Sequence, residues 1–246
     1  MSAEGCESIQ GCDTRRLPAA RVRRGIEGSP VKVRLLETTV RRLNERGLAL
    51  LTKAAQAGDW TASWKEILPL WAHASEGTLG RAACCRMVLF DFNFQRLAWW
   101  SRVSNAQPEE SPQLRLSTFH TDEAISLARD LLLEAWSAAR SLSPVSSLVF
   151  GMAPEVAALI ARLSPRDMDH VVVHEIQELR PRWENRPMFW KELFHAATQM
   201  DDQILANVQL HCLQLLGGEL ASARDRAVVS VTATEGPVTE ATVQES

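Results

Sequence analysis

The chain of 246 residues contains no tyrosine and only four lysines, and it has no long apolar run. Crossing a bilayer takes about 18 to 20 consecutive apolar residues. The N-terminal sequence MSAEGCESIQGC also lacks the apolar segment of a secretory signal. We therefore expect a cytoplasmic protein that makes no contact with a membrane. Nearly all of the 27 basic residues are arginines, whose guanidinium groups suit fixed ion pairs and the recognition of phosphate or carboxylate.

Cysteine is too sparse and too scattered for a structural framework. The five cysteines are Cys6, Cys12, Cys84, Cys85 and Cys212, an odd number whose spacing fits neither a disulfide scaffold nor a zinc site. The adjacent pair Cys84 and Cys85 would project about 100° apart on a helix. We interpret both as small core residues.

Enzymatic motifs are missing as well. The glycine-containing segments GTLG and GGEL match no phosphate-binding loop, and no nucleophile has an orienting base nearby. His170 and His174 are four residues apart, a spacing that can bind a metal from one helical face. The zincin order, however, requires Glu where Val171 stands, and no third ligand is evident. We predict no enzyme, no metal site and no cofactor, with a hydrolase using the two histidines as the alternative.

Charge and composition set the two ends apart from the rest. Residues 1–46 carry a net charge of +4, which leaves −7 for the remainder, so the body is no bulk binder of polyanions. Residues 1–30 combine glycine, proline and arginine without periodicity and predict a disordered basic arm. Residues 217–246 are rich in Ala, Val, Thr, Ser and Glu and predict a disordered tail.

Helical periodicity dominates residues 31–105. Apolar residues from Val33 to Ala55 recur every three or four positions, which predicts a helix with Gly47 as a candidate interruption. The segment Arg81–Trp100 has strand-like alternation of phenylalanines, but no partner strand is visible elsewhere. We therefore predict one helix there, and a helical module over residues 31–105 whose role is unknown. Residues 106–120, with two prolines and several polar residues, predict a linker.

Residues 121–216 contain repeated helix-start signals. Thr121, Pro154, Ser164 with Pro165, and Pro187 each precede an amphipathic stretch. The last stretch predicts one long helix that ends at Gly217 and Gly218. The fold class expected from these patterns is all-α, with a helical N-terminal module, a C-terminal helical bundle and disordered termini.

An arginine-rich loop offers the best candidate binding residues. Arg180, Arg182 and Arg186 stand near two prolines that stiffen the backbone, an arrangement able to bind nucleic-acid phosphates. Aromatic residues beside them are candidates for a partner interface, because aromatic side chains are enriched at binding hot spots: Trp183, Phe189 and Trp190. The alternative is structural, with the arginines paired to nearby glutamates and Trp183 filling a gap between helices.

Three segments resemble the FlhD family of flagellar transcriptional regulators over about residues 118–200. They are DLLLEAWSAARSL (Asp130–Leu142), LVFGMAPEVAALIARLSPRDMDHV (Leu148–Val171) and ELRPRWENRPMFWKEL (Glu178–Leu193). The resemblance implies an all-helical subunit that self-associates, binds an FlhC-like partner and contacts promoter DNA as part of the complex. The chain departs from the family by its extra N-terminal residues and its longer last helix.

On these grounds we expect a non-enzymatic transcriptional regulator subunit. The alternative is a cytosolic accessory or scaffold protein of a bacterial secretion or flagellar apparatus. Its eight tryptophans would then serve protein interfaces without DNA.

Overall fold

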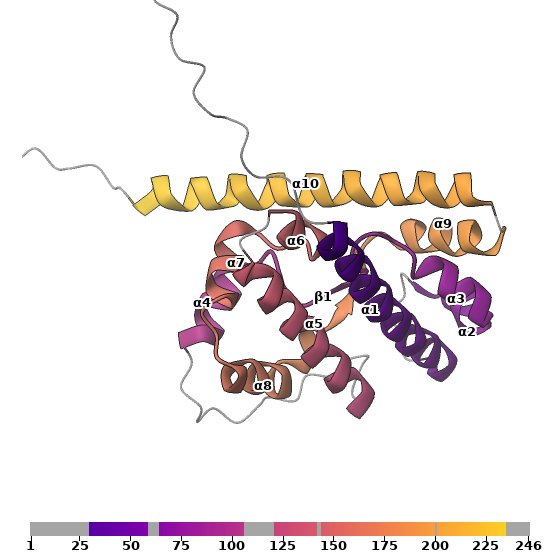
Figure 1. The fold of residues 1–246 in the computed structure, drawn as a ribbon, viewed down its shortest axis with the longest axis horizontal. Helices are drawn as coiled ribbons and strands as arrows, with labels where there is room; N and C mark the ends of the chain where they lie inside the picture. The colour runs from indigo at the N-terminus through magenta and orange to yellow at the C-terminus, as the bar shows by residue number, and fades with distance from the viewer. Residues whose placement is uncertain (1–29, 59–63, 106–120, 142–143, 200, 235–246) are drawn as a thin grey trace, which may run out of the picture.

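The computed structural model describes residues 30–58, 64–105, 121–141, 144–199 and 201–234, and this part of the chain is mainly helical, as expected (Figure 1). The basic arm up to residue 29 and the linker lie outside the described residues. The elements follow in the order α1 (Pro30–Ala57), α2 (Leu68–Ala72), α3 (Glu76–Ala82), β1 (Phe90–Asp91), α4 (Leu97–Asn105), α5 (Asp122–Arg140), α6 (Pro144–Val149), α7 (Pro154–Ile160), α8 (Pro165–His174), a 3-10 turn (Ile176–Glu178), β2 (Arg180–Pro181), α9 (Pro187–Thr198) and α10 (Asp202–Thr234).

Several helices begin at the residues that the sequence marks. Thr121 caps α5 by accepting a hydrogen bond from the Ala124 amide at 3.2 Å. Ser164 and Asp167 form a reciprocal capping box at the start of α8. The same cap holds the Asp167 carboxyl in hydrogen bonds that lower its pKa below the usual range. Pro154 lies in the first turn of α7. The amide groups in the first turn of a helix have no acceptor within the helix. Nearby side chains accept hydrogen bonds from them, and this favours a helix start at these residues.

The prediction of one helix over Arg81–Trp100 is wrong. Helix α3 ends at Ala82, and the chain then crosses the core as a loop, the short strand β1 and a turn before α4 begins. The buried side chain of Asn44 organises this loop. Its amide nitrogen donates to the carbonyls of Ala83, Cys85 and Met87 at 3.0–3.3 Å, and its oxygen accepts from the Leu89 amide at 2.8 Å. One polar side chain thus satisfies backbone groups that a helix would otherwise pair.

The prediction of a single last helix ending at Gly217 is also wrong. Helix α9 ends at Thr198, and α10 begins separately at Asp202. The Asp201 carboxylate accepts from the amides of Gln203 and Ile204 at 2.8 and 3.4 Å, which favours a new start. Helix α10 then runs through Gly217 and Gly218 to Thr234, so residues 217–234 are no disordered tail; residues 235–246 lie outside the described part.

Helices α1 and α5 pack against each other with ion pairs at successive turns. Arg42 pairs with Glu134 at 3.0 Å, and Arg46 pairs with Asp130. The residue numbers run in opposite directions along the two helices, so the pair is antiparallel. These partly exposed pairs fix the register rather than supply much stability.

One hydrophobic core extends through both segments that the sequence divides at residues 106–120. It includes α1, α5 and the segments around the sheet. The tryptophans among its wholly buried side chains are Trp64, Trp71, Trp100 and Trp190. We call residues 30–105 the first half and residues 121–199 the second half, because they contribute to this core jointly.

The two halves repeat one local structure at an offset of 90 residues. Asn93 and Trp183 both adopt left-handed backbone with φ of 56°. The Arg96 amide donates to the Asn93 carbonyl at 2.9 Å, and the Arg186 amide donates to the Trp183 carbonyl at 2.7 Å. The indoles of Trp100 and Trp190 both donate to carbonyls in these turns.

The sheet shows that the repeats are related by an approximate two-fold axis. Strand β1 pairs antiparallel with β2, with Phe90 opposite Pro181 and Asp91 opposite Arg180. The residues 90 positions after Phe90 and Asp91 are Arg180 and Pro181. Exchanging the two halves therefore converts the Phe90–Pro181 pair into the Arg180–Asp91 pair. This is the geometry of an isologous interface, here within one chain.

The last helix of each half packs on the other half. Helix α4 contacts α7, and α9 contacts α2. The Ala153 amide donates to the Phe94 carbonyl at 3.0 Å, while the Trp64 indole donates to the carbonyl of Glu184, the counterpart of Phe94, at 2.8 Å. The halves are therefore interlocked, and neither completes its core alone.

Gly47 does not interrupt α1; it lets β1 approach the helix. A Cβ at Gly47 would lie 2.1 Å from the ring of Phe90. We predict that Gly47→Ala lowers the free energy of unfolding by about 1–3 kcal/mol through overpacking, despite the better helix propensity of alanine. Urea denaturation of the full chain measures this. Gly80→Ala in α3, where a Cβ meets nothing within 4 Å, is the control and should be neutral or slightly stabilising.

Candidate functional site

The arginine-rich loop lies at the two-fold junction, where β1 meets β2, and lines a pocket of about 530 Å³. The second half contributes the loop from Arg180 to Asn185, the first half contributes β1 and the turn that precedes α4, and α10 contributes one carboxylate. The residues that line it are Asp91, Gln95, Arg96, Arg180, Pro181, Arg182, Trp183, Glu184, Asn185 and Glu219.

Arg182 is buried and is committed to internal contacts, so its assignment as a phosphate contact is corrected. Only 3% of the residue is exposed. Its guanidinium donates to the Phe150 carbonyl at 2.6 Å and lies 3.7 Å from Asp91 and 3.9 Å from Glu219. A buried charge needs such partners, because removing it from water is costly otherwise.

Gly151 provides the space for this guanidinium. Its backbone is left-handed, with φ of +62°, and a Cβ there would lie 1.9 Å from Nη1 of Arg182. Glycine tolerates the left-handed backbone and also leaves out the Cβ atom for which there is no space.

Arg180 has a more open environment. Its side chain is 37% exposed and donates to Oδ1 of Asn93 at 2.8 Å and to Oδ2 of Asp91 at 3.3 Å. The Asn93 amide in turn donates to Glu178 at 2.7 Å. One edge of Arg180 therefore orders the turn after β1, and the rest of the group faces solvent.

Arg186 is exposed immediately before α9. Its counterpart by the 90-residue offset is Arg96, exposed immediately before α4. Of the three arginines, Arg182 is thus internal, Arg180 is half-buried and Arg186 is free to meet a ligand.

The three aromatic candidates are core residues, so their assignment to a partner interface is also corrected. Trp183, Phe189 and Trp190 are at most 4% exposed. The Trp190 ring contacts Trp64 and Trp71 of the first half, with centroids 5.6 and 5.8 Å apart. These rings form the interface between the halves, where aromatic edge contacts add to apolar burial.

The rings of His170 and His174 lie side by side on α8, with centroids 4.1 Å apart. Among the described residues, no group of three or more His, Cys, Asp or Glu side chains gathers as a metal site would require. In the same part of the chain, no helix is long and apolar enough to span a bilayer.

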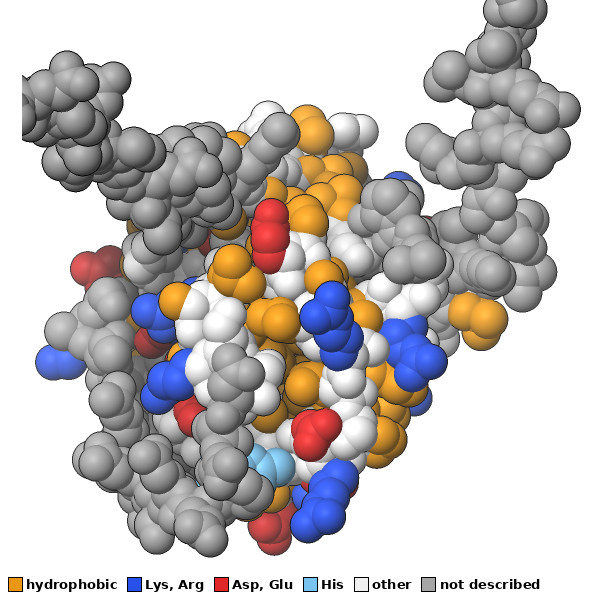
Figure 2. Space-filling model, turned by 90° about the vertical axis from the view of Figure 1, so that its left-hand side faces the viewer, with side chains coloured by type: hydrophobic (Ala, Val, Ile, Leu, Met, Phe, Trp, Pro, Cys, Tyr) orange, Lys and Arg blue, Asp and Glu red, His pale blue; other side chains and the backbone are white. Residues whose placement is uncertain are grey.

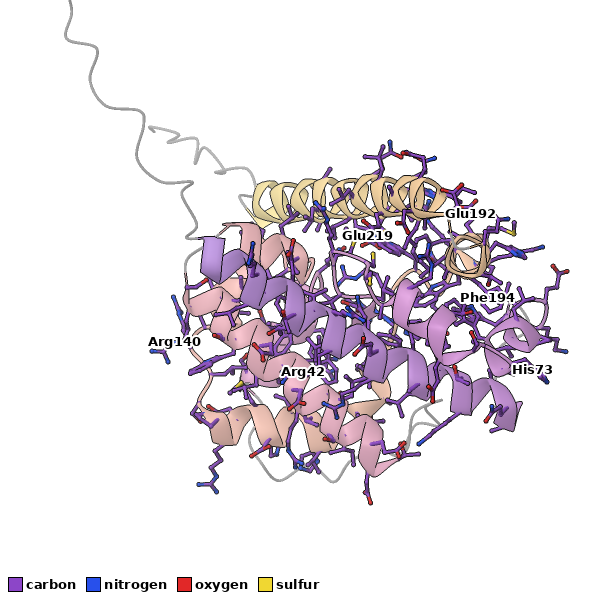
Figure 3. All side chains as sticks on the ribbon, turned by 45° about the vertical axis from the view of Figure 1, so that its right-hand side comes forward. Arg42, His73, Arg140, Glu192, Phe194 and Glu219 are labelled. Atoms are coloured by element: carbon purple, nitrogen blue, oxygen red, sulfur yellow. The ribbon has the colours of Figure 1, made fainter. Side chains whose placement is uncertain are left out.

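Sequence reasoning missed the acidic partners in the pocket. Asp91 pairs with Arg180 and Arg182 and also accepts from the amides of Asn93 and Phe94, both at 3.2 Å. Glu219 comes from α10, which Figure 3 shows passing over the body with this residue directed inward. The recurrence of Arg-x-x-aromatic-Trp at Arg96–Trp100 and Arg186–Trp190 was the available signal for the junction.

A second candidate surface is a row of exposed residues on α10. The inner side of the helix carries Leu205, Val208, Cys212 and Leu216, all buried. The outer stripe, as we call the row about a third of a turn around the helix from the inner side, carries Ala206, Leu210, Leu213 and Gly217, all exposed. Leu210 and Leu213 are 56% and 48% exposed. The steps of four, three and four residues are the spacing with which one helix packs against another.

No family model, curated protein or solved structure matches this chain. The resemblance to the FlhD family therefore stays a prediction from the sequence.

Partial burial strips water from the Glu219 carboxyl and raises its pKa; Arg182 and Gln95 counteract this only in part. The folded state thus binds a proton more readily than the unfolded state, and ionisation costs stability. The stabilisation that comes from protonating Glu219 is fully present below about pH 4.3, the pKa of an unfolded glutamate. It is lost as the pH rises through the pKa of Glu219 in the folded state.

We predict that Glu219→Gln becomes more stable relative to wild type as the pH rises across this window. Urea denaturation at pH 4, 5.5 and 7 gives the difference between the two proteins at each pH. Glu37→Gln on the exposed face of α1 controls for the loss of a charge. A gap that is constant with pH, or that favours wild type at pH 7, would contradict the assignment.

Proposed function

We propose that this chain is a non-enzymatic subunit of a heteromeric complex that regulates transcription, in which an FlhC-like protein docks on the outer stripe of α10 and the complex binds promoter DNA. The outer stripe is the observation that carries the proposal. Two leucines at its centre are about half exposed, although the helix already buries its inner side against the body.

The stripe has the features of a helix-docking surface. Ala206 and Gly217 at its ends are small and permit close approach of another backbone. The exposed neighbours Gln203, Asn207 and Gln214 are polar but uncharged, so docking would not remove a charge from water. Burying the exposed half of each leucine would contribute about 1 kcal/mol. A helix with an apolar seam is the partner that fits.

Helix α10 is attached to the body by side-chain contacts along the part that carries the stripe. His211 lies 3.1 Å from Glu192 of α9, Arg81 pairs with Asp202 at 3.0 Å, and Gln209 donates to the Cys84 carbonyl at 3.2 Å. A surface presented in one conformation loses less entropy on binding. Figure 1 shows α10 lying along one side of the molecule, over α9 and α6 and extending beyond them.

DNA contact would come from few arginines and needs a second subunit. Figure 2, which views the side where α4, α7 and α8 lie, shows basic and acidic side chains interspersed with hydrophobic ones. Such mixed charge does not attract DNA by bulk field. Within this chain, Arg186 and the half-exposed Arg180 are the candidates that remain, with Arg96 as the counterpart of Arg186.

We predict that Leu210→Glu and Leu213→Glu each weaken partner binding by about 10- to 100-fold or more, because a charge replaces buried apolar area. Affinity purification from the native host followed by titration of the co-purified subunit measures this. Leu133→Glu on α5 is the control, since Leu133 is 49% exposed and lies away from α10.

The identity of the partner separates the candidate functions. A cysteine-rich FlhC-like protein recovered with promoter fragments supports the proposal. Secretion-machine proteins recovered without DNA would favour the accessory or scaffold function. Self-association that Leu213→Glu abolishes would assign the stripe to a second copy of this chain.

We predict that Arg186→Ala lowers the affinity of the assembled complex for all DNA sequences alike. Loss of one phosphate contact should flatten the slope of log affinity against log salt by about 0.9. Fluorescence anisotropy at several salt concentrations measures the slope, with Arg166→Ala at the exposed start of α8 as the control. A change limited to one DNA sequence, or an unchanged slope, would remove Arg186 from the contact residues.

A further inference from the structure

We propose that Cys85 and Cys212 form a reversible oxidation site, in which a hydroperoxide converts the two thiols into an intramolecular disulfide that ties α10 to the loop after α3. The proposal stands on the geometry of the thiols and does not depend on the proposed function.

The two sulfurs already lie side by side. Their Sγ atoms are 3.5 Å apart although the residues are separated by 127 positions in sequence. Cys85 is 2% exposed and Cys212 is fully buried on the inner side of α10. A disulfide has an S–S length near 2.05 Å, so closing it takes a movement of about 1.5 Å.

The surrounding contacts hold both partners in place. Asn44 donates to the carbonyl of Cys85 itself, at 3.3 Å, which fixes the loop. Gln209, three residues before Cys212, donates to the Cys84 carbonyl at 3.2 Å and fixes α10 against the same loop. The two thiols are therefore close together because the loop and α10 are both held in place. No free chain end has to move to bring them together.

The environment distinguishes the roles of the two thiols. The hydrogen-bond contact with the Cys212 sulfur lowers the pKa of Cys85, and the amides of Met87 and Arg86 and the charge of Arg182 act in the same direction, against burial, which raises it. The same contact and burial raise the pKa of Cys212. Cys85 is thus the thiolate-forming partner, and thiolates are the species that react with peroxides.

One hydroperoxide accepts the two electrons that are released when the two thiols form a disulfide. With hydrogen peroxide, the Cys85 thiolate attacks one oxygen, the O–O bond breaks, and a sulfenic acid and a hydroxide ion result; the hydroxide takes up the proton that the Cys85 thiol had released and becomes water. The Cys212 sulfur then attacks the Cys85 sulfur, the S–O bond breaks, and a second water leaves with the thiol proton. Two electrons pass from the sulfurs to the peroxide, and a dithiol reductant reverses the bond by exchange.

The bond would act on α10 as a whole. In the reduced chain, side-chain contacts and the apolar inner side hold this helix to the body, and local opening of such an element precedes global unfolding. A covalent link in the middle of the inner side prevents that opening. The outer stripe lies about a third of a turn around the helix from Cys212 and stays exposed in both states.

Peptide mapping of the full chain tests the site. Trypsin cleaves after Arg81 and Arg86, which leaves Cys84 and Cys85 in one peptide. The reduced Cys84→Ser variant is therefore treated with hydrogen peroxide, its remaining thiols are blocked with N-ethylmaleimide, and the digest is analysed by mass spectrometry. We expect a peptide containing Cys85 linked to the peptide containing Cys212, which dithiothreitol releases. Blocked free thiols at both positions, links between different chains, or over-oxidised sulfur without the linkage would overturn the proposal.

Limited proteolysis of α10 supplies a second readout. Peroxide should slow cleavage within α10 at least about tenfold in Cys84→Ser, because opening is suppressed. Dithiothreitol should restore the original rate. Adding Cys212→Ala to Cys84→Ser should abolish the peroxide effect. Equal cleavage rates in oxidised and reduced Cys84→Ser would show that the bond does not hold α10. If the double variant does not fold, the linkage map and the reversal by dithiothreitol still decide the matter.

Discussion

The pairing of β1 with β2 across an approximate two-fold axis is the contact around which the described structure is built. It brings Asp91 against Arg180 and Arg182, and it sets each half so that its last helix lies on the other half. Because each last helix packs on the other half, both halves contribute side chains to one aromatic core. The Trp190 ring, for example, packs on tryptophans more than a hundred residues earlier in the chain.

This arrangement explains why a polar pocket lies beside the hydrophobic core. Two short strands leave backbone and side-chain polar groups at the junction, and buried groups of this kind need partners. Asp91 satisfies the turn amides and both arginines, and Glu219 reaches in from α10 to meet Arg182. Much of the charge that looked available for nucleic acid is therefore used internally.

Helix α10 departs from the symmetry of the halves and gives the molecule its distinctive surface. Its inner side completes the core over α9 and carries Cys212 to Cys85, while its outer stripe leaves leucines in solvent. A helix with apolar residues in two separate rows has a weak amphipathic pattern, which is why its length was hard to infer from periodicity. With two apolar rows, α10 is suited to pack against the body of this chain and against a second protein at the same time.

The sequence by itself determined the helical class and many helix starts, because a cap such as Thr121 or the box of Ser164 and Asp167 acts within a few residues. It also singled out the arginine-rich loop, but not the position of that loop at the junction of two halves. Only the tertiary structure decided which of those arginines face solvent, that Arg81–Trp100 breaks into separate elements, and that α10 continues beyond Gly217. Those outcomes depend on partners distant in sequence, such as Asn44 for the loop and Glu219 for Arg182. Local propensity carries no record of such contacts.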